Sequence, residues 1–230
     1  MKQLILAALL LSAAPATAAT RNFGVSGFDR VRVDGDYKVT LTVGIAPFAK
    51  AQGTMRALDP VEVMVEGRTL IVRAKTSASW GGYPGESAGP VEVTIGTHEL
   101  TAAFVNGAGS LAINKVRGLK FEASAQGAGS IAIDRVEVDV FQLGLAGAAS
   151  ARLAGKALKM TAMVRGSSAL DGEGLVVKDA VIGAQGPAIV KLTATGTAKV
   201  DAIGVAAVTL SGKPSCIVTI KGSASVSGCR

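Results

Sequence analysis

The chain has 230 residues and a formal net charge of +7, and most of its 49% hydrophobic content is Ala and Val. Aromatic residues make up only 4%, which excludes one bulky aromatic core and favours many thin, repetitive layers. Because 29 glycines accompany only 7 prolines, the composition also differs from that of a disordered Pro/Gly-rich chain.

The first nineteen residues have the three parts of a secretory signal peptide. Lys2 precedes an apolar run, Leu4–Leu11, and small residues then provide cleavage signatures around Ala18. This run is too short to span a bilayer stably, and no other apolar run approaches membrane-spanning length. A retained membrane anchor is the alternative. We expect removal of residues 1–19 and export of the mature chain to the periplasm, the extracellular space or the cell surface.

Residues 20–103 have the pattern of strands with one buried face. In FDRVRVDGDYKVTLTV, residues 28–43, apolar residues alternate with charged or hydroxyl residues on either side of a turn at DGD. VEVMVEGRTLIVRA, residues 61–74, predicts a hairpin that turns at Glu-Gly-Arg. Residues 76–90 have the composition of a loop, and strand pattern returns after them. We therefore expect an N-terminal β portion interrupted by one loop.

The second half of the chain repeats a glycine-containing phrase at a nearly constant period. The glycines of five consecutive phrases are spaced by 20, 20, 19 and 20 residues, and such a fixed period indicates stacked structural repeats. The phrases are NGAGSLAI with Gly107, QGAGSIAI with Gly127, AGAASARL with Gly147, RGSSALDG with Gly166 and QGPAIVKL with Gly186.

Each repeat also contains the alternation of strands. Leu111 and Ile113 stand four and six positions after Gly107, most other repeats have similar residues there, and a second alternating set follows. Helices fit poorly because glycine is frequent and β-branched residues alternate, and a propeller blade needs about 40 residues. Coils that bury their apolar faces against neighbouring coils fit best.

We therefore predict an all-β, parallel β-helix-like solenoid over residues 104–230, with coils of about 20 residues. An antiparallel or irregular β portion, residues 20–103, precedes it. After Gly186 the period blurs, and we expect partial coils that open at Gly212 and Gly222, followed by a C-terminal cap.

Cys216 and Cys229 are the only cysteines. In an oxidising compartment they can pair and pin the last strand. A redox or metal pair is the alternative, but the spacing is not CxxC and no histidine lies nearby. We expect no metal ion and no cofactor.

In the order and spacing of these features, the mature chain resembles one known family. The matching segments are FDRVRVDGDYKVTLTVG, GRTLIVRA and VEVTIGTHELTAAFVNGAGSL, which runs into the serial GAGS coils. They are similar to the putative auto-transporter adhesin, head GIN domain family of secreted bacterial proteins. The resemblance implies a right-handed parallel β-helix-like fold and export beyond the inner membrane. The third to fifth repeats depart from the family pattern because they lack the full Gly-x-Gly-Ser phrase.

No arrangement of residues in the sequence indicates a catalytic site. A glycosidase or lyase needs clustered carboxylates, and the closest pair here, Asp171 and Glu173, is typical of a solvated turn. His98, the only histidine, has no identifiable nucleophile or orienting partner. Ser110 and Ser130 recur with the corners, where hydroxyls bond turn backbone. A carbohydrate-active enzyme on the same scaffold remains the alternative function.

Basic and aromatic residues give the only indications of a binding surface. Four lysines lie twelve or thirteen residues after the glycine of their coil: Lys120, Lys159, Lys178 and Lys199. Coils stacked in register would align them in a stripe for an anionic glycan; a solvated face that discourages edge pairing is the alternative. Trp80 and Tyr83 lie in the loop, where they could contact sugars or proteins, or belong to a flexible insertion.

The sequence therefore predicts a secreted, non-enzymatic module that is adhesion-like or structural in the cell envelope. The expected partners are an anionic glycan, an envelope polysaccharide or another protein, and edge strands offer a route to a homo-oligomer. Nucleic acid is not expected for a secreted chain without aromatic platforms. No transmembrane segment is expected after signal cleavage.

Overall fold

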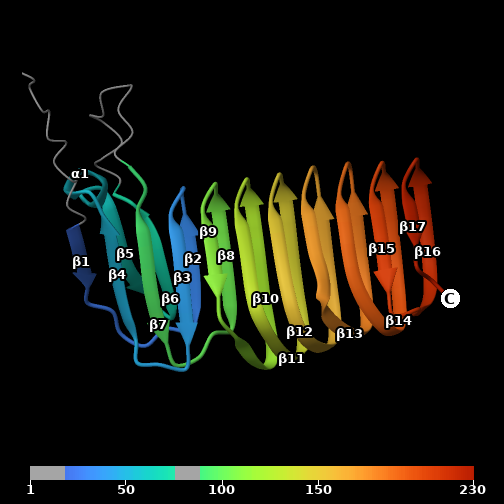
Figure 1. Cartoon of the computed structure of the whole chain (residues 1–230), viewed down its shortest axis with the longest axis horizontal. Helices are drawn as coiled ribbons and strands as arrows, with labels where there is room; N and C mark the ends of the chain where they lie inside the picture. The colour runs from blue at the N-terminus through green and yellow to red at the C-terminus, as the bar shows by residue number, and fades with distance from the viewer. Residues whose placement is uncertain (1–18, 76–88) are drawn as a thin grey trace, which may run out of the picture.

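The computed structural model describes residues 19–75 and 89–230 of the chain. Nearly all of them belong to strands that wind in stacked parallel coils, so the chain forms a β-solenoid of about six turns (Figure 1). The predicted fold class is confirmed. Of the predicted signal peptide, residues 1–18 lie outside the described residues, as do residues 76–88 of the predicted loop.

In the repeat region each coil is one long strand that bends at its corners. These strands are β10 (Val116–Gly127), β11 (Ser130–Gly147), β12 (Ser150–Arg165), β13 (Ala169–Gln185) and β14 (Ile189–Gly204). Each pairs in parallel with the next, so equivalent residues stack in rows along the solenoid axis.

The parallel segments on either side of the corner glycines form two faces of the solenoid, face A and face B. Face A contains the segments just after a corner glycine: β3 (Lys38–Val43), β9 (Ser110–Ile113), the first residues of β11 to β14, β15 (Ala207–Ser211) and β17 (Ser225–Ser227). Face B contains the segments that lead into the next corner: β6 (Thr69–Ala74), β2 (Arg30–Asp34), β8 (Ala102–Gly107), the last residues of β10 to β14, and β16 (Ser215–Gly222).

Antiparallel strands complete the N-terminal end, as expected for this portion. On face A, β7 (Glu92–Thr97) pairs with β4 (Phe48–Gly53), which pairs with β1 (Ala19–Phe23). On face B, β5 (Val61–Glu66) forms the predicted hairpin with β6. A short helix, α1 (Met55–Leu58), was not predicted; the Thr54 hydroxyl accepts a hydrogen bond from its Ala57 N–H at 3.1 Å, and Leu58 is buried.

The core consists of rows of inward side chains, which the alternating pattern predicts. Leu111, Ile131 and Leu153 are buried one above the other on face A. On face B, Phe121 and Phe141 are fully buried with ring centroids 5.7 Å apart. No coil could bury such a row alone, so adjacent coils supply the core for one another.

The repeated glycines stack at one corner of the solenoid. Gly107, Gly127 and Gly147 all have positive φ, and a Cβ on Gly127 would lie 2.7 Å from the Gly107 carbonyl oxygen. Both the backbone conformation and the close approach therefore require glycine. The corner continues through Gly204 and Gly222, and Gly212, which the sequence suggested as an opening, instead approaches the backbone of Ala194. The prediction for Gly212 was wrong because the last coils shorten.

The predicted disulfide between Cys216 and Cys229 is confirmed, with a Cα–Cα distance of 5.7 Å. Cys216 continues the core row of Phe121 and Phe141 on β16, and Cys229 follows β17. The bond therefore closes the final coil, which has no following coil to hold it in place.

A buried carboxylate ties the N-terminal hairpin to the stack. Asp29 is 6% exposed and accepts hydrogen bonds from Arg68 Nε at 3.0 Å, Arg68 Nη2 at 2.8 Å and the Thr101 hydroxyl at 3.1 Å. The Arg68 hydrogen bond lowers the pKa of Asp29 below its ordinary value of 3.8, burial opposes this shift, and Thr101 adds to it.

We expect Asp29→Asn to lower the free energy of unfolding by about 2 kcal/mol at neutral pH, because charge-assisted hydrogen bonds are lost. A carboxylate with a lowered folded-state pKa stabilises the fold above the unfolded pKa and loses this effect as pH falls through the folded value. The difference between wild type and variant in urea unfolding should therefore shrink as the pH drops below 3.8. A difference that stays constant down to strongly acid pH would contradict the assignment.

Candidate ligand-binding groove

The residues considered for catalysis do not come together in the structure. Asp171 pairs with Arg152 at 3.4 Å, whereas Glu173 pairs with Lys191 at 3.5 Å, so each carboxylate is engaged by a different cation. His98 is exposed. The described part of the chain also contains no group of three or more His, Cys, Asp or Glu side chains that could hold a metal ion.

The four lysines of the predicted stripe occupy different positions. Lys120 and Lys159 share one row on face B with Val140 between them, and the next position in that row is Asp179. Lys178 is one residue earlier on its coil, and Lys199 belongs to a parallel row two residues further along the strand. The counts from the corner glycine miss this because bulges shift the register, one of them between Val177 and Asp179. Trp80 and Tyr83 lie outside the described residues.

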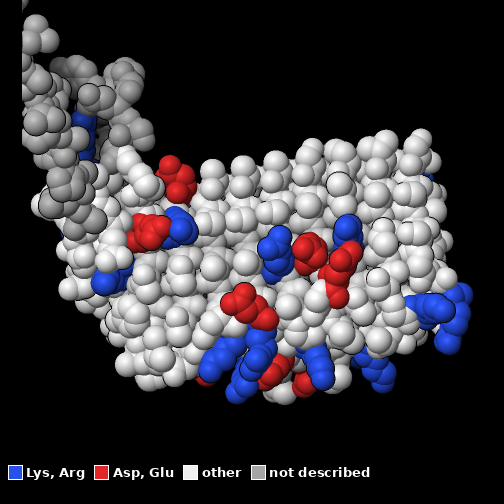
Figure 2. All heavy atoms as spheres, viewed as in Figure 1, with Lys and Arg blue, Asp and Glu red and all other residues white. Residues whose placement is uncertain are grey.

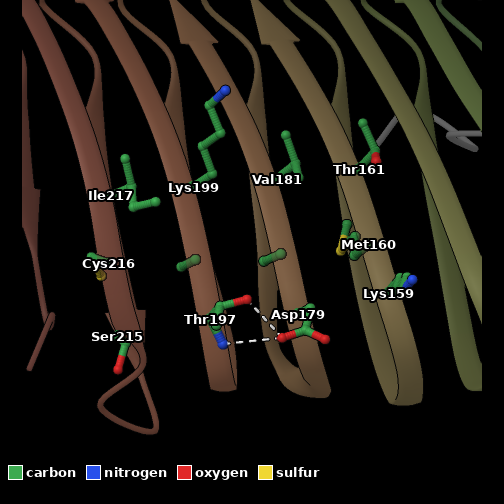
Figure 3. A pocket seen from close by; sticks show the side chains of 12 residues that line it. Lys159, Met160, Thr161, Asp179, Val181, Thr197, Lys199, Ser215, Cys216 and Ile217 are labelled. Carbon is green, nitrogen blue, oxygen red and sulfur yellow. Dashed lines mark hydrogen bonds between the residues drawn. The ribbon is translucent and has the colours of Figure 1, made fainter.

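Two of these lysines flank a groove of about 330 Å³ that crosses β12, β13, β14 and β16 on face B (Figure 3). Such a volume is within the usual range for small-ligand sites. One wall is an outer row formed by Lys159, Asp179, Thr197 and Ser215, and the other is formed by Thr161, Val181, Lys199 and Ile217. Between these rows lie Met160, Ala180, Ala198 and Cys216.

Strand alternation explains why these side chains form two walls. Residues 159 and 161 point outward on either side of the inward Met160, and the same holds on the next three strands. Val181 and Ile217 are 44% and 71% exposed, so the wall that contains Lys199 also presents aliphatic surface. The arrangement gives a largely apolar channel with ammonium groups at its margins.

The carboxylate in the groove is engaged within the protein. Asp179 Oδ1 accepts hydrogen bonds from the Thr197 hydroxyl at 2.7 Å and from the Thr197 backbone N–H at 3.2 Å, as the dashed lines in Figure 3 show. These bonds are the largest influence that lowers the pKa of Asp179, and Lys178 and Lys159 contribute further. Asp179 therefore acts first as a cross-strand tie between β13 and β14.

The lysines remain available to a ligand. Lys159 and Lys199 are exposed, and neither makes a hydrogen bond or an ion pair with another described residue. In Figure 3 they arise from opposite walls, two strands apart. Other cations of the repeat region, such as Arg117 and Arg152, are paired with acidic residues of the next coil. The groove therefore combines unpaired positive charge with apolar surface.

The groove ends at β16, the last strand of face B. Val218 and Ile220 continue inward rows whose previous members, Val200 and Ala202, are fully buried, yet they are 39% and 48% exposed. Residues 202–230 contain Lys213, Lys221 and Arg230 but no acidic residue. In Figure 2 the charged atoms visible at the end that carries the C-terminus are accordingly all Lys or Arg, whereas elsewhere both signs are present.

The sequence did not predict this groove, although one signal was present. The core row of face B changes from Phe121, Phe141 and Met160 to Ala180 and Ala198, and the groove lies over this small-residue part of the row. Without the register between coils, the two alanines cannot be recognised as members of the phenylalanine row.

Comparison with known proteins identifies similar chains. A family model described as putative auto-transporter adhesin, head GIN domain, matches residues 27–214. No curated protein sequence matches. Among the described residues, no helix has the length and apolar character needed to cross a membrane.

Solved structures share the architecture at low sequence identity. A putative adhesin from Bacteroides fragilis superposes with a TM-score of 0.80 at 16% identity, covering 91% of this chain and 95% of its own. A putative lipid binding protein from Parabacteroides distasonis gives 0.69 at 17% identity, covering 92% and 96%. A putative adhesin from Parabacteroides merdae gives 0.66 at 14% identity, with the same coverage. At these identities the similarity shows the fold.

Proposed function

The chain belongs to the putative auto-transporter adhesin, head GIN domain family, and on this premise we propose that it is an exported, non-enzymatic binding module of the cell envelope with an adhesion-like role. The single observation that carries the proposal is the groove on face B, which presents unpaired ammonium groups beside apolar surface. A site of this kind recognises a ligand without needing groups that make or break bonds.

Two further observations support a binding role. Structural neighbours bear the names of adhesins and, in one case, of a lipid binding protein. The carboxylates most suitable for catalysis, Asp171 and Glu173, are held in separate ion pairs. Rigid stacked strands also keep the groove in one shape, which lowers the ordering cost of binding.

Binding of the mature protein to isolated envelope fractions tests the proposal. We expect an envelope component to be retained by the immobilised protein in low salt and released unchanged at high salt, since screening weakens contacts to exposed lysines. The released material should have its original chain length by mass spectrometry. Cleavage of an envelope polysaccharide by the protein would instead support a lyase or glycosidase, and retention of no component would reject the binding role.

A further inference from the structure

We propose that the groove on face B binds an anionic amphiphile, a single molecule with an acidic headgroup and an apolar chain. The inference deepens the proposed function and rests on it, because it names the class of ligand that the binding module takes. It is carried by the charges at the margins of the groove, the apolar surface within it, and its opening at the C-terminal end of the solenoid.

The charges select an anion. Lys159 and Lys199 have no protein partner among the described residues, whereas the only carboxylate that lines the groove, Asp179, already accepts two hydrogen bonds from Thr197. A cationic ligand would therefore meet two ammonium groups and one committed carboxylate. An acidic headgroup would be attracted from both walls, and the basic C-terminal end adds to the favourable potential.

The walls select an apolar chain. Val181, Lys199 and Ile217 stand side by side in one row, so aliphatic side chains on either side of a lysine face the channel. Between the walls lie only Met160, Ala180, Ala198 and Cys216, none of which brings a charge. A sugar ring would find no aromatic side chain among the lining residues on which to stack. An alkyl chain needs only the exclusion of water, which this surface provides.

The shape of the groove accommodates a chain rather than a compact anion. The channel crosses four parallel strands, and three strand spacings of about 4.8 Å give it a span of roughly 14 Å. At β16 it reaches the end of the solenoid, where Val218 and Ile220 are exposed. An apolar chain that enters between the lysines can thus run toward further aliphatic surface.

The test uses the mature protein and three probes below their critical micelle concentrations. Dodecyl phosphate carries both features, dodecyl maltoside carries the chain without the charge, and inorganic phosphate carries the charge without the chain. Calorimetric titration should detect dodecyl phosphate binding at least about tenfold tighter than either of the others, because each of them lacks one class of contact.

Two variants with matched charge changes locate the site. Lys159→Ala with Lys199→Ala should weaken dodecyl phosphate binding by about tenfold or more. Lys120→Ala with Lys178→Ala removes the same charge from exposed lysines that do not line the groove, and should change the affinity by less than about twofold. Ile217→Ser, at a 71% exposed position that does not endanger folding, should also weaken binding.

Several outcomes would overturn the proposal. Equal weakening by both lysine pairs would indicate general charge attraction instead of a groove. Binding to vesicles of phosphatidylglycerol without binding to monomeric dodecyl phosphate would indicate a membrane surface as the partner. If the protein ignores dodecyl phosphate yet retains an envelope polysaccharide, the amphiphile is rejected while the proposed function stands. If no envelope component binds either, both are rejected.

Discussion

Replacing Phe141 with alanine is expected to lower the free energy of unfolding by about 3–5 kcal/mol, among the largest effects of any single truncation in this chain. Phe141 is fully buried and packs against Phe121 with ring centroids 5.7 Å apart. The core of this solenoid otherwise consists mainly of small aliphatic side chains, and the hydrogen-bonded coils on either side prevent the site from collapsing around the cavity. The loss therefore includes the transfer term and a cavity term.

Denaturant unfolding followed by circular dichroism measures the effect, and Leu119→Ala provides the control. Leu119 is a large aliphatic residue at the preceding corner but is 78% exposed, so its truncation should change the stability by less than about 0.5 kcal/mol. Hydrogen exchange should show the loss of protection of Phe141→Ala concentrated in β10 to β12, because repeat stability depends on neighbouring coils. Similar losses for Phe141 and Leu119 would contradict the packing of the two phenylalanines as a core row.

The features that could be predicted from the sequence are those that repeat at every coil. The period of Gly107, Gly127 and Gly147 indicated a stack, because each glycine answers the same steric demand from the glycine below it. The alternation at Leu111 and Ile113 indicated the buried side of a strand, because side chains on a strand point to opposite faces. Both signals are local in sequence and are reinforced by repetition.

The features that could not be predicted depend on the register between coils. Lys159, Asp179 and Thr197 occupy one row although they follow their corner glycines by 12, 13 and 11 residues. Bulges within the coil absorb these differences, and nothing in the local pattern of a single repeat fixes where a bulge falls. The predicted lysine stripe therefore dissolved, and the groove between two rows emerged only with the structure.

Counting from the glycines nevertheless selected two residues of the groove. Lys159 and Lys199 were chosen as members of one stripe, and they prove to stand on opposite walls of the same channel. The charge pattern thus pointed to the right region of face B for a geometric reason that does not hold. Titration with dodecyl phosphate, with Lys120 and Lys178 as the comparison, decides whether these two lysines bind an anion.

A second large effect is expected at the glycine corner, where Gly147→Ala should lower the free energy of unfolding by about 3 kcal/mol. Gly147 has φ of +87°, and a Cβ there would lie 2.7 Å from the Gly127 carbonyl oxygen. An L-residue pays about 1–2 kcal/mol for the left-handed conformation. The backbone of the coil below would also have to move, and this contact recurs at the same corner in neighbouring coils.

Two control substitutions separate these causes in the same unfolding assay. Gly67→Ala, in the β5–β6 turn, has φ of +60° but no atom within 4 Å of the new Cβ, so only the conformational cost of about 1 kcal/mol remains. Gly144→Ala lies on the same strand as Gly147 without positive φ, and its nearest contact is the Ser124 hydroxyl at 3.4 Å, so it should be neutral or stabilising by about 0.5 kcal/mol. The expected order of stability is Gly144→Ala, Gly67→Ala, then Gly147→Ala. If Gly147→Ala cost no more than Gly67→Ala, the close stacking of coils at the corner would not be what requires glycine, and the period in the sequence would need another physical explanation.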